Sequence, residues 1–228
     1  CVHVIEQKCL FQKHCSSWVS LDARLNRITA EQGDLLREGQ ALLRAGLPTN
    51  QVGMLLLAAA KRSIALPEGF TAMIRARNFH AAAPMVRMQL DTALRVAALR
   101  FVSDPHAYAE AVMEGKAVYK LKDDTGVRLT DHRLLERLAE TFPWINTVYR
   151  DASAFVHLSA RHLWTSISAI EEAERLVVFQ ISSCVPARVT EDQYYDAVDA
   201  FYHCLLLAKG LILSGMRQVA NLGNGSAE

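Results

Sequence analysis

The segment "YRDASAFVHLSARHLW", residues 149–164, places two arginines, two histidines and an aspartate among large apolar side chains. It contains neither glycine nor proline, and Pro143 suits the first turn of a helix. The sequence therefore predicts one helix from Pro143 to about residue 164. On such a helix Arg150 and His157 differ by about 20° in azimuth and by about 10 Å in height.

A narrow polar stripe follows this predicted helix beside its broad apolar face. The stripe consists of Asn146, Arg150, Ser153, His157 and Arg161. Any amphipathic helix shows a polar flank, so a solvated surface is the plainer interpretation. In that case Arg150 pairs with Asp151 or with a neighbouring helix, and His157 is a boundary histidine whose hydrogen bonds are satisfied.

An arginine and a histidine two turns apart suit the cleavage of a phosphodiester. An imidazole such as that of His157 can accept a proton from a ribose 2′-hydroxyl or donate one to a leaving oxygen. The guanidinium of Arg150 can hold the phosphate and stabilise the charge that develops on it. Such a cleavage needs no metal ion, and the sequence predicts neither a metal site nor a cofactor.

Composition limits the kinds of partner. The 228 residues suffice for one sizeable domain, or for a domain with an extension. Hydrophobic residues make up 51% of the chain and charged residues 21%, which argues against wholesale disorder. The net charge is only +1, so any contact with nucleic acid must be local rather than a general electrostatic attraction.

The five cysteines form no CxxC pair, which favours reduced thiols in a cytoplasmic protein. His3, Cys9, His14 and Cys15 could ligate a metal, but their spacing fits no closed zinc pattern. The first fifteen residues are too polar for a signal peptide, and the longest apolar runs are too short to cross a bilayer. We therefore expect a soluble cytoplasmic protein with no membrane contact.

The order of hydrophobic and turn-forming residues predicts a mainly α-helical bundle with one small β-hairpin near residues 165–181. Thr130 is the expected cap of one helix, and Thr190 with Gln193 matches a capping box. Breaks are expected at "AGLPTNQ" and "LPEGF". The expected helices cover residues 5–46, 51–65, 70–102 with a kink at Pro84, a short segment after Pro105, 131–140, 143–164 and 190–219.

At "RDASAFVH" the sequence resembles the HEPN superfamily of small helical-bundle proteins, whose signature is an arginine, four to six residues and a histidine. A polar residue often follows the arginine, as Asp151 does here. A second likeness, to related bacterial proteins, is "MVRMQLD", with Arg87 and Asp91 one turn apart. The resemblance covers roughly residues 70–215. It implies an N-terminal helical extension over 1–46 and a HEPN-like bundle over 47–228.

The resemblance also implies a function. Many members of the superfamily are metal-independent endoribonucleases in toxin–antitoxin and phage-defence systems, and the active ones are typically homodimers whose motifs meet in a cleft. His157 would then be the acid or base and Arg150 the phosphate holder. Asp151 would orient Arg150 or pair across the dimer. The implied partners are RNA, a second copy of the chain, and an antitoxin or other protein.

Two other functions stay open. The bundle is either a catalytically inactive module that binds RNA, a nucleotide or a protein, or a structural dimerisation module. The neighbouring stripe on the predicted helix 70–102 could supply a second wall of the cleft; it consists of Arg77, His80, Arg87, Asp91 and Arg95. Two structural interpretations compete with this one. The spacing favours an ion-pair ladder along one helix, and the alternative is a buried pair of Arg87 with Asp91 that fixes the helix of Arg150.

Overall fold

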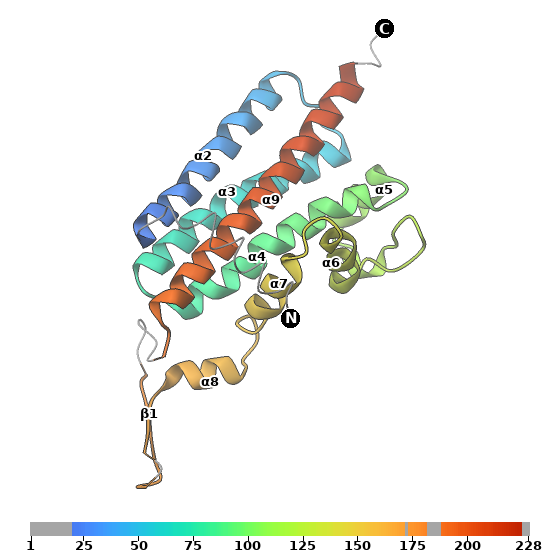
Figure 1. Cartoon of the computed structure of the whole chain (residues 1–228). Helices are drawn as coiled ribbons and strands as arrows, with labels where there is room; N and C mark the ends of the chain where they lie inside the picture. The colour runs from blue at the N-terminus through green and yellow to red at the C-terminus, as the bar shows by residue number, and fades with distance from the viewer. Residues whose placement is uncertain (1–19, 172, 182–187, 225–228) are drawn as a thin grey trace.

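Four long helices pack side by side in the computed structural model of the chain, which describes residues 20–171, 173–181 and 188–224 (Figure 1). They are α2 (Leu21–Arg44), α3 (Gln51–Arg75), α4 (Phe79–Ala97) and α9 (Glu191–Asn224). Helix α9 contacts the other three, so it is the central element of the bundle. The prediction of a mostly helical protein with a small hairpin is confirmed.

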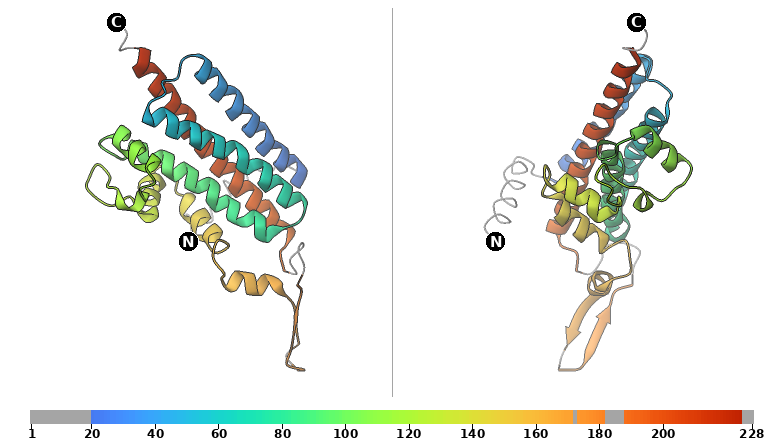
Figure 2. Two further views of the ribbon diagram at one scale, coloured as in Figure 1. Left: turned by 180° about the vertical axis from the view of Figure 1, so that it is seen from behind. Right: turned by 90° about the vertical axis from the view of Figure 1, so that its right-hand side faces the viewer.

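Shorter elements lie between α4 and α9 in the sequence (Figures 1 and 2). Helix α5 packs on α3, while α6 and α7 pack on α4. In chain order these elements are η1 (Ala98–Arg100), α5 (Pro105–Met113), η2 (Val118–Lys120), α6 (Asp131–Ala139), α7 (Ile145–Ser153), α8 (Ala160–Ser166), β1 (Ile167–Glu171) and β2 (Leu176–Phe179).

Buried side chains from these helices form one hydrophobic core. At its centre the rings of Phe70 on α3 and Phe201 on α9 stack with centroids 4.0 Å apart and planes 9° apart. Leu25 and Ile28 of α2 are fully buried in the same core. The N-terminal helix α2 therefore shares its packing with the rest of the bundle.

Side-chain caps explain where several helices begin. The expected cap at Thr130 is confirmed, because its Oγ1 accepts a hydrogen bond from Arg133 N at 3.2 Å. The expected capping box before α9 is confirmed as well. Thr190 N donates to Gln193 Oε1 at 2.9 Å, and Gln193 N donates to Thr190 Oγ1 at 3.4 Å.

The expected break at residues 66–70 is wrong. Helix α3 continues through Pro67 to Arg75, because Leu66, Pro67 and Phe70 are all buried and packing outweighs the cost of an internal proline. The chain turns instead at Arg77, whose φ of 57° is left-handed. Asn78 then caps α4, so the single helix expected over 70–102 is also wrong.

The single helix expected over 143–164 is divided into α7 and α8. Helix α7 ends at Ser153, and Ser159 caps α8 by accepting a hydrogen bond from Arg161 N at 3.3 Å. In return Ser159 N donates to the His162 ring at 3.3 Å, which completes a capping box. The sequence pattern missed it because this box normally ends in Glu or Gln, not His. Arg150 and His157 therefore do not lie on one helix.

Helix α9 is long enough and apolar enough over Glu191–Asn221 to span a membrane, judged by length and composition alone. The expectation that every apolar stretch is too short is thus wrong for this helix. However, 61% of its most apolar window is buried inside the bundle. Packing against three other helices already accounts for its composition.

The loop before α6 differs from the solvated loop that its polar sequence suggests. The side chain of Asp123 is 0% exposed and accepts hydrogen bonds from Val127 N and Thr125 N, both at 2.9 Å. Arg133 Nε also donates to it at 2.8 Å. Burial alone would raise the pKa of Asp123, but these hydrogen bonds lower it, so the carboxylate stays charged.

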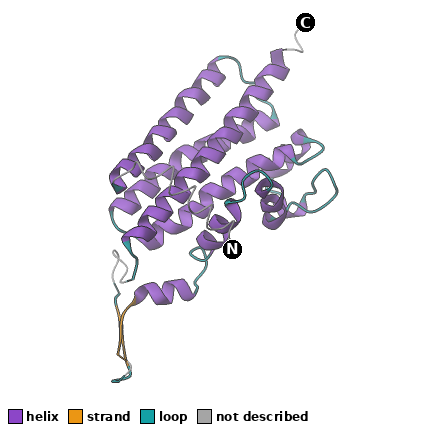
Figure 3. Ribbon diagram, in the orientation of Figure 1, coloured by secondary structure: helices purple, strands orange, loops and turns teal. Residues whose placement is uncertain are grey.

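The expected hairpin is confirmed (Figure 3). Strands β1 and β2 pair antiparallel, with Ala169 opposite Val178 and Glu171 opposite Leu176. Together with α8 the hairpin projects away from the long helices, as Figures 1 and 2 show from three directions. The side chain of Ile167, at the start of β1, is buried.

Candidate functional site

The exposed end of α7 brings together three of the charged residues that the sequence singled out. Asp151 Oδ1 lies 3.4 Å from Arg150 Nε and 3.6 Å from Arg161 Nη2. The side chains of Arg150, Asp151 and Arg161 are 74%, 49% and 48% exposed. At these distances and exposures the pairs are weak. Two guanidinium groups therefore share one carboxylate and remain accessible to another anion.

His157 lies in the bend between α7 and α8, where its side chain is exposed. Within the described residues it makes no side-chain hydrogen bond or ion pair. Because it follows the end of α7, its position relative to Arg150 is not set by helix pitch. The two remaining residues of the expected stripe stay on α7, where Asn146 is exposed one turn before Arg150 and Ser153 is half-buried at the helix end.

A network of charged residues anchors α7 to the bundle just beneath this surface. Asp131, the first residue of α6, accepts from Arg87 Nη2 at 2.5 Å and from Arg95 Nη2 at 2.6 Å. Tyr149 Oη donates to the same carboxylate at 3.1 Å. The Arg87 guanidinium also lies 4.2 Å from the centroid of the Tyr149 ring. Tyr149 directly precedes Arg150, so the network fixes the helix that carries Arg150.

The carboxyl of Asp131 stays ionised because of the arginines beside it. Burial by itself raises the pKa of Asp131, but Arg95 and Arg87 outweigh this effect and lower the pKa below its usual range. Asp91 lies 2.9 Å from Arg95 Nη2 and 3.7 Å from Arg87 Nη1, so the ladder expected along α4 is present. Arg62 of α3 adds a further contact to Asp91 at 3.6 Å. Arg87 and Asp91 therefore belong to the network that holds α7 in place, Arg87 through Asp131 and Tyr149, and Asp91 through Arg87.

A second cluster, which the sequence did not suggest, joins α8 to the start of α4. His80 Nε2 lies 2.7 Å from Thr165 Oγ1, which donates its own proton to Arg161 O at 2.8 Å. These bonds assign the Nε2–H tautomer to neutral His80. The His80 and His162 rings have centroids 5.4 Å apart. Burial and the nearby His162 lower the pKa of His80, so its neutral form is favoured.

The sequence contains a local signal that positions each histidine of this cluster, but none that predicts their contact. His80 stands two residues after Asn78, which caps α4, and His162 stands three residues after Ser159, which caps α8. Each histidine is therefore placed by a local capping motif. Their meeting depends on how α8 packs against the bundle, which no local pattern reveals.

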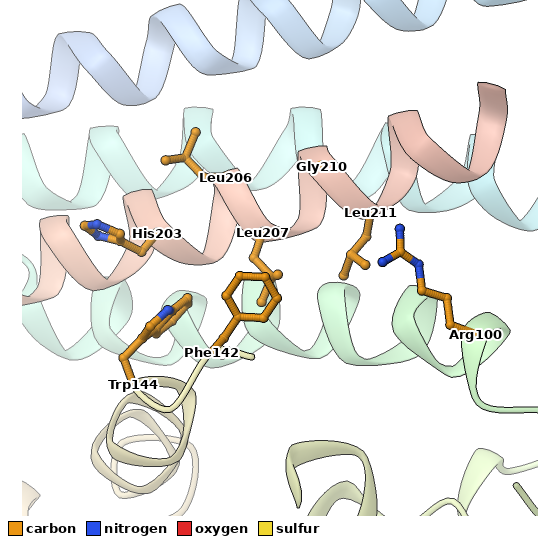
Figure 4. Close-up of a pocket in the computed structure, with 8 residues that line it drawn as sticks. All are labelled: Arg100, Phe142, Trp144, His203, Leu206, Leu207, Gly210 and Leu211. Carbon is orange, nitrogen blue, oxygen red and sulfur yellow. The ribbon is translucent and has the colours of Figure 1, made fainter. Parts of the chain in front are cut away.

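An apolar groove of about 340 Å³ lies along α9, away from the residues expected to form the site (Figure 4). Figure 4 shows the rings of Phe142 and Trp144 facing α9, with Arg100 at the other end of the groove. Arg100 Nη2 donates to Ser214 Oγ at 3.1 Å. The lining residues are Arg100, Phe142, Trp144, His203, Leu206, Leu207, Gly210 and Leu211.

In the part of the chain that the structure describes, no group of three His, Cys, Asp or Glu side chains is arranged to hold a metal ion. The four N-terminal candidates, His3, Cys9, His14 and Cys15, lie outside the described residues. Comparison of the chain with protein-family models, with curated proteins and with solved structures gave no match.

Proposed function

We propose that the chain is a metal-independent endoribonuclease of the HEPN type that acts in the cytoplasm. The observation that carries the proposal is the pair Arg150 and Arg161, which flanks the single carboxylate of Asp151. Each ion pair is weak enough for a phosphate group to compete for the arginine. The exposed arginine pair is a candidate phosphate holder, and His157, exposed in the bend between α7 and α8, is the candidate proton carrier.

In the proposed reaction the 2′-hydroxyl of RNA attacks the adjacent phosphorus. Neutral His157 accepts the hydroxyl proton as the new oxygen–phosphorus bond forms. The bond to the 5′-oxygen breaks, and that oxygen takes a proton from water or from imidazolium. The products are a 2′,3′-cyclic phosphate and a 5′-hydroxyl end. Arg150 and Arg161 stabilise the negative charge on the phosphoryl oxygens.

A second function within the same fold is a catalytically silent module that binds RNA through this surface. It is favoured by the fact that no described residue orients the His157 ring, whereas an efficient general base is usually held by a hydrogen bond. In the enzyme this orientation would have to come from the RNA or from a second protein chain.

The proposed ribonuclease would serve as a toxin or a phage-defence effector restrained by a protein partner.

Cleavage of labelled single-stranded RNA and transfer RNA in excess chelator tests the enzyme. Wild type should cleave, and His157→Ala should lose about 100-fold or more in rate, the usual contribution of a general acid or base. His106→Ala, which removes another exposed histidine on α5, is the matched control and should cleave like wild type. Equal cleavage by wild type and His157→Ala would rule out His157 as the base.

Binding measurements separate the enzyme from the silent module. Filter binding of single-stranded RNA should weaken about tenfold in Arg150→Ala and in Arg161→Ala, because each removes a charge-assisted contact. Arg44→Ala, an exposed arginine at the end of α2, should bind like wild type. RNA binding without cleavage by any of these proteins would identify the silent module. Absence of both binding and cleavage would overturn the proposed function.

A further inference from the structure

The arm formed by α8 and the hairpin, residues 160–181, exposes an unusual amount of apolar surface. All four residues of β2 are exposed, although all four are hydrophobic. A strand that is apolar on both faces is typical of the inside of a sheet rather than of an isolated hairpin. The large exposed side chains of the arm are Leu163, Trp164, Ile170, Leu176, Val177, Val178, Phe179 and Ile181.

The hairpin of the arm is poorly supported by the rest of the molecule, whereas α8 is tied to α4 through the contact of Thr165 with His80. Within the described residues its sheet has two strands, so β1 and β2 each have one edge without a partner strand. A two-stranded hairpin is marginally stable by itself in water, and an open apolar edge is a template for further pairing. In Figures 1 and 2 the hairpin extends beyond the long helices rather than lying on them.

We propose that this arm is a homodimerisation surface on which the β2 strands of two copies pair edge to edge and antiparallel. A two-fold axis through Val178 makes the strand its own complement. It places Val178 opposite Val178 of the partner subunit and Val177 opposite Phe179 of the partner subunit. Pairs of aromatic and β-branched residues are among the more stabilising cross-strand contacts. The result is a continuous four-stranded sheet with an isologous interface.

Charge favours antiparallel over parallel pairing. Of the described residues at the turn end of the hairpin, Glu171, Glu174 and Arg175 have a net charge of −1. In parallel pairing the turn ends of two copies would lie together and repel each other, whereas antiparallel pairing separates them.

The available area also suits a dimer. Phe179 is 51% exposed and Ile181 is 97% exposed, while the other six large apolar residues are each about half exposed. A large apolar side chain that is half exposed contributes roughly 100 Å². The arm therefore offers roughly 800 Å² of apolar surface, more than the few hundred Å² that monomers usually leave exposed. This is about the area per partner of a stable interface, and edge-to-edge pairing of β2 buries the part that β2 and Ile181 contribute.

This inference goes beyond the proposed ribonuclease, because the surface consists of β2 and its neighbours rather than of Arg150 and His157. Dimerisation would still affect that site. Arg161 is the second residue of α8, so fixing the arm also fixes one of the two arginines beside Asp151.

Paired charge variants of the full chain test the interface and its register. In Val177→Lys/Phe179→Glu each lysine would face a glutamate of the partner subunit. In Val177→Lys/Phe179→Lys each lysine would face a lysine. The hairpins of the two variants are equally polar. The variants differ in whether the charges that face each other across the proposed two-fold axis are opposite or alike. Circular dichroism and urea unfolding should first show that both are folded like wild type.

Sedimentation equilibrium and light scattering at several concentrations give the outcome. Wild type should be a dimer, the Lys/Glu protein a weaker dimer, and the Lys/Lys protein about tenfold weaker again or monomeric. Mixing the Lys/Lys protein with Val177→Glu/Phe179→Glu should restore a dimer. A monomeric wild type would overturn the proposal, whether or not that monomer binds phosphatidylcholine vesicles. Two other results would also overturn it: a dimer that neither double substitution weakens, and equal weakening of the dimer by the two double substitutions.

Discussion

The anchor beneath the candidate site leads to a quantitative prediction. Asp131→Asn keeps the size of the side chain but removes the charge that Arg87 and Arg95 contact. The side chain of Asp131 is 30% exposed, so water partly replaces what is lost. Both arginines also keep their contacts with Asp91.

The magnitude follows from these contacts. A hydrogen bond to a charged group typically contributes about 1.5–3 kcal/mol when buried, and a solvent-exposed ion pair contributes about 0–1 kcal/mol. For two charged hydrogen bonds that are partly exposed, we expect a loss of about 2 kcal/mol in the free energy of unfolding. In a domain of this size that corresponds to a fall of about 4–8 °C in Tm.

Urea unfolding followed by circular dichroism measures this loss directly. Tyr149→Phe removes only the neutral donor to Asp131, so it should cost about 0.5–1 kcal/mol. Asp151→Asn changes an exposed aspartate only two residues further along the chain and should cost less than about 0.5 kcal/mol. A loss below about 0.5 kcal/mol in Asp131→Asn would show that the network does not anchor α7.

The same anchor has a defined pH dependence. The pKa of Asp131 is lower in the folded protein than the usual value of about 3.9 in an unfolded chain. Its stabilising effect is therefore complete above the unfolded pKa and is lost as the pH falls through the folded pKa. The stabilities of wild type and Asp131→Asn should converge below about pH 4. A difference that persists unchanged at lower pH would refute the electrostatic explanation.

Three other predictions follow from single contacts. Gly53→Ala should lose about 2 kcal/mol or more, because a Cβ there lies 2.3 Å from Pro48 O, whereas Gly33→Ala meets nothing within 4 Å and should gain about 0.5–1 kcal/mol. Asp123→Asn should cost about 2–3 kcal/mol in urea unfolding, since it removes the charge of a buried carboxylate that accepts several hydrogen bonds, while Arg133 and Arg137 keep Glu136 and Asp124. The pKa of His80 is lowered by folding, so wild-type stability should fall as the pH drops below about 6.5, and His80→Gln should flatten that dependence.

Features that depend on a few neighbouring residues could be predicted from the sequence. The caps at Thr130 and at Thr190 with Gln193 are local hydrogen bonds, and the structure has both. The hairpin was found because its strands are rich in β-branched residues and flank a polar turn. The caps depend on contacts three residues apart and the hairpin on two strands joined by a short turn, and a sequence displays both directly.

Features that depend on distant packing could not be predicted. Pro67 was expected near a helix end, but the buried neighbours Leu66 and Phe70 hold it inside α3. The polar loop around Asp123 shows no sign of burial in its sequence, but Arg133 and Arg137 of α6 contact its carboxylate. In each case a contact with another element reverses the local preference, and a single sequence does not show that contact.

The division between α7 and α8 changes how the candidate site must be understood. On one continuous helix, Arg150 and His157 would be placed by a common backbone. Instead, Arg150 follows Tyr149, which is tied to Asp131 on α6, whereas α8 is tied to α4 through Thr165 and His80. His157 lies in the bend between these two anchors.

This separation has a functional consequence. Asp151 contacts Arg150 on α7 and Arg161 on α8, while Ser159 Oγ, which donates to Ala154 O at 2.6 Å, also joins the two parts. Both ion pairs of Asp151 are long and exposed, so the two arginine side chains can move at little energetic cost. A phosphate bound between the two arginines would draw them together more strongly than one shared carboxylate does. In the proposed ribonuclease, Arg150 and Arg161 would therefore take their final positions when RNA binds, and α8 belongs to the arm whose hairpin we propose to pair in a dimer.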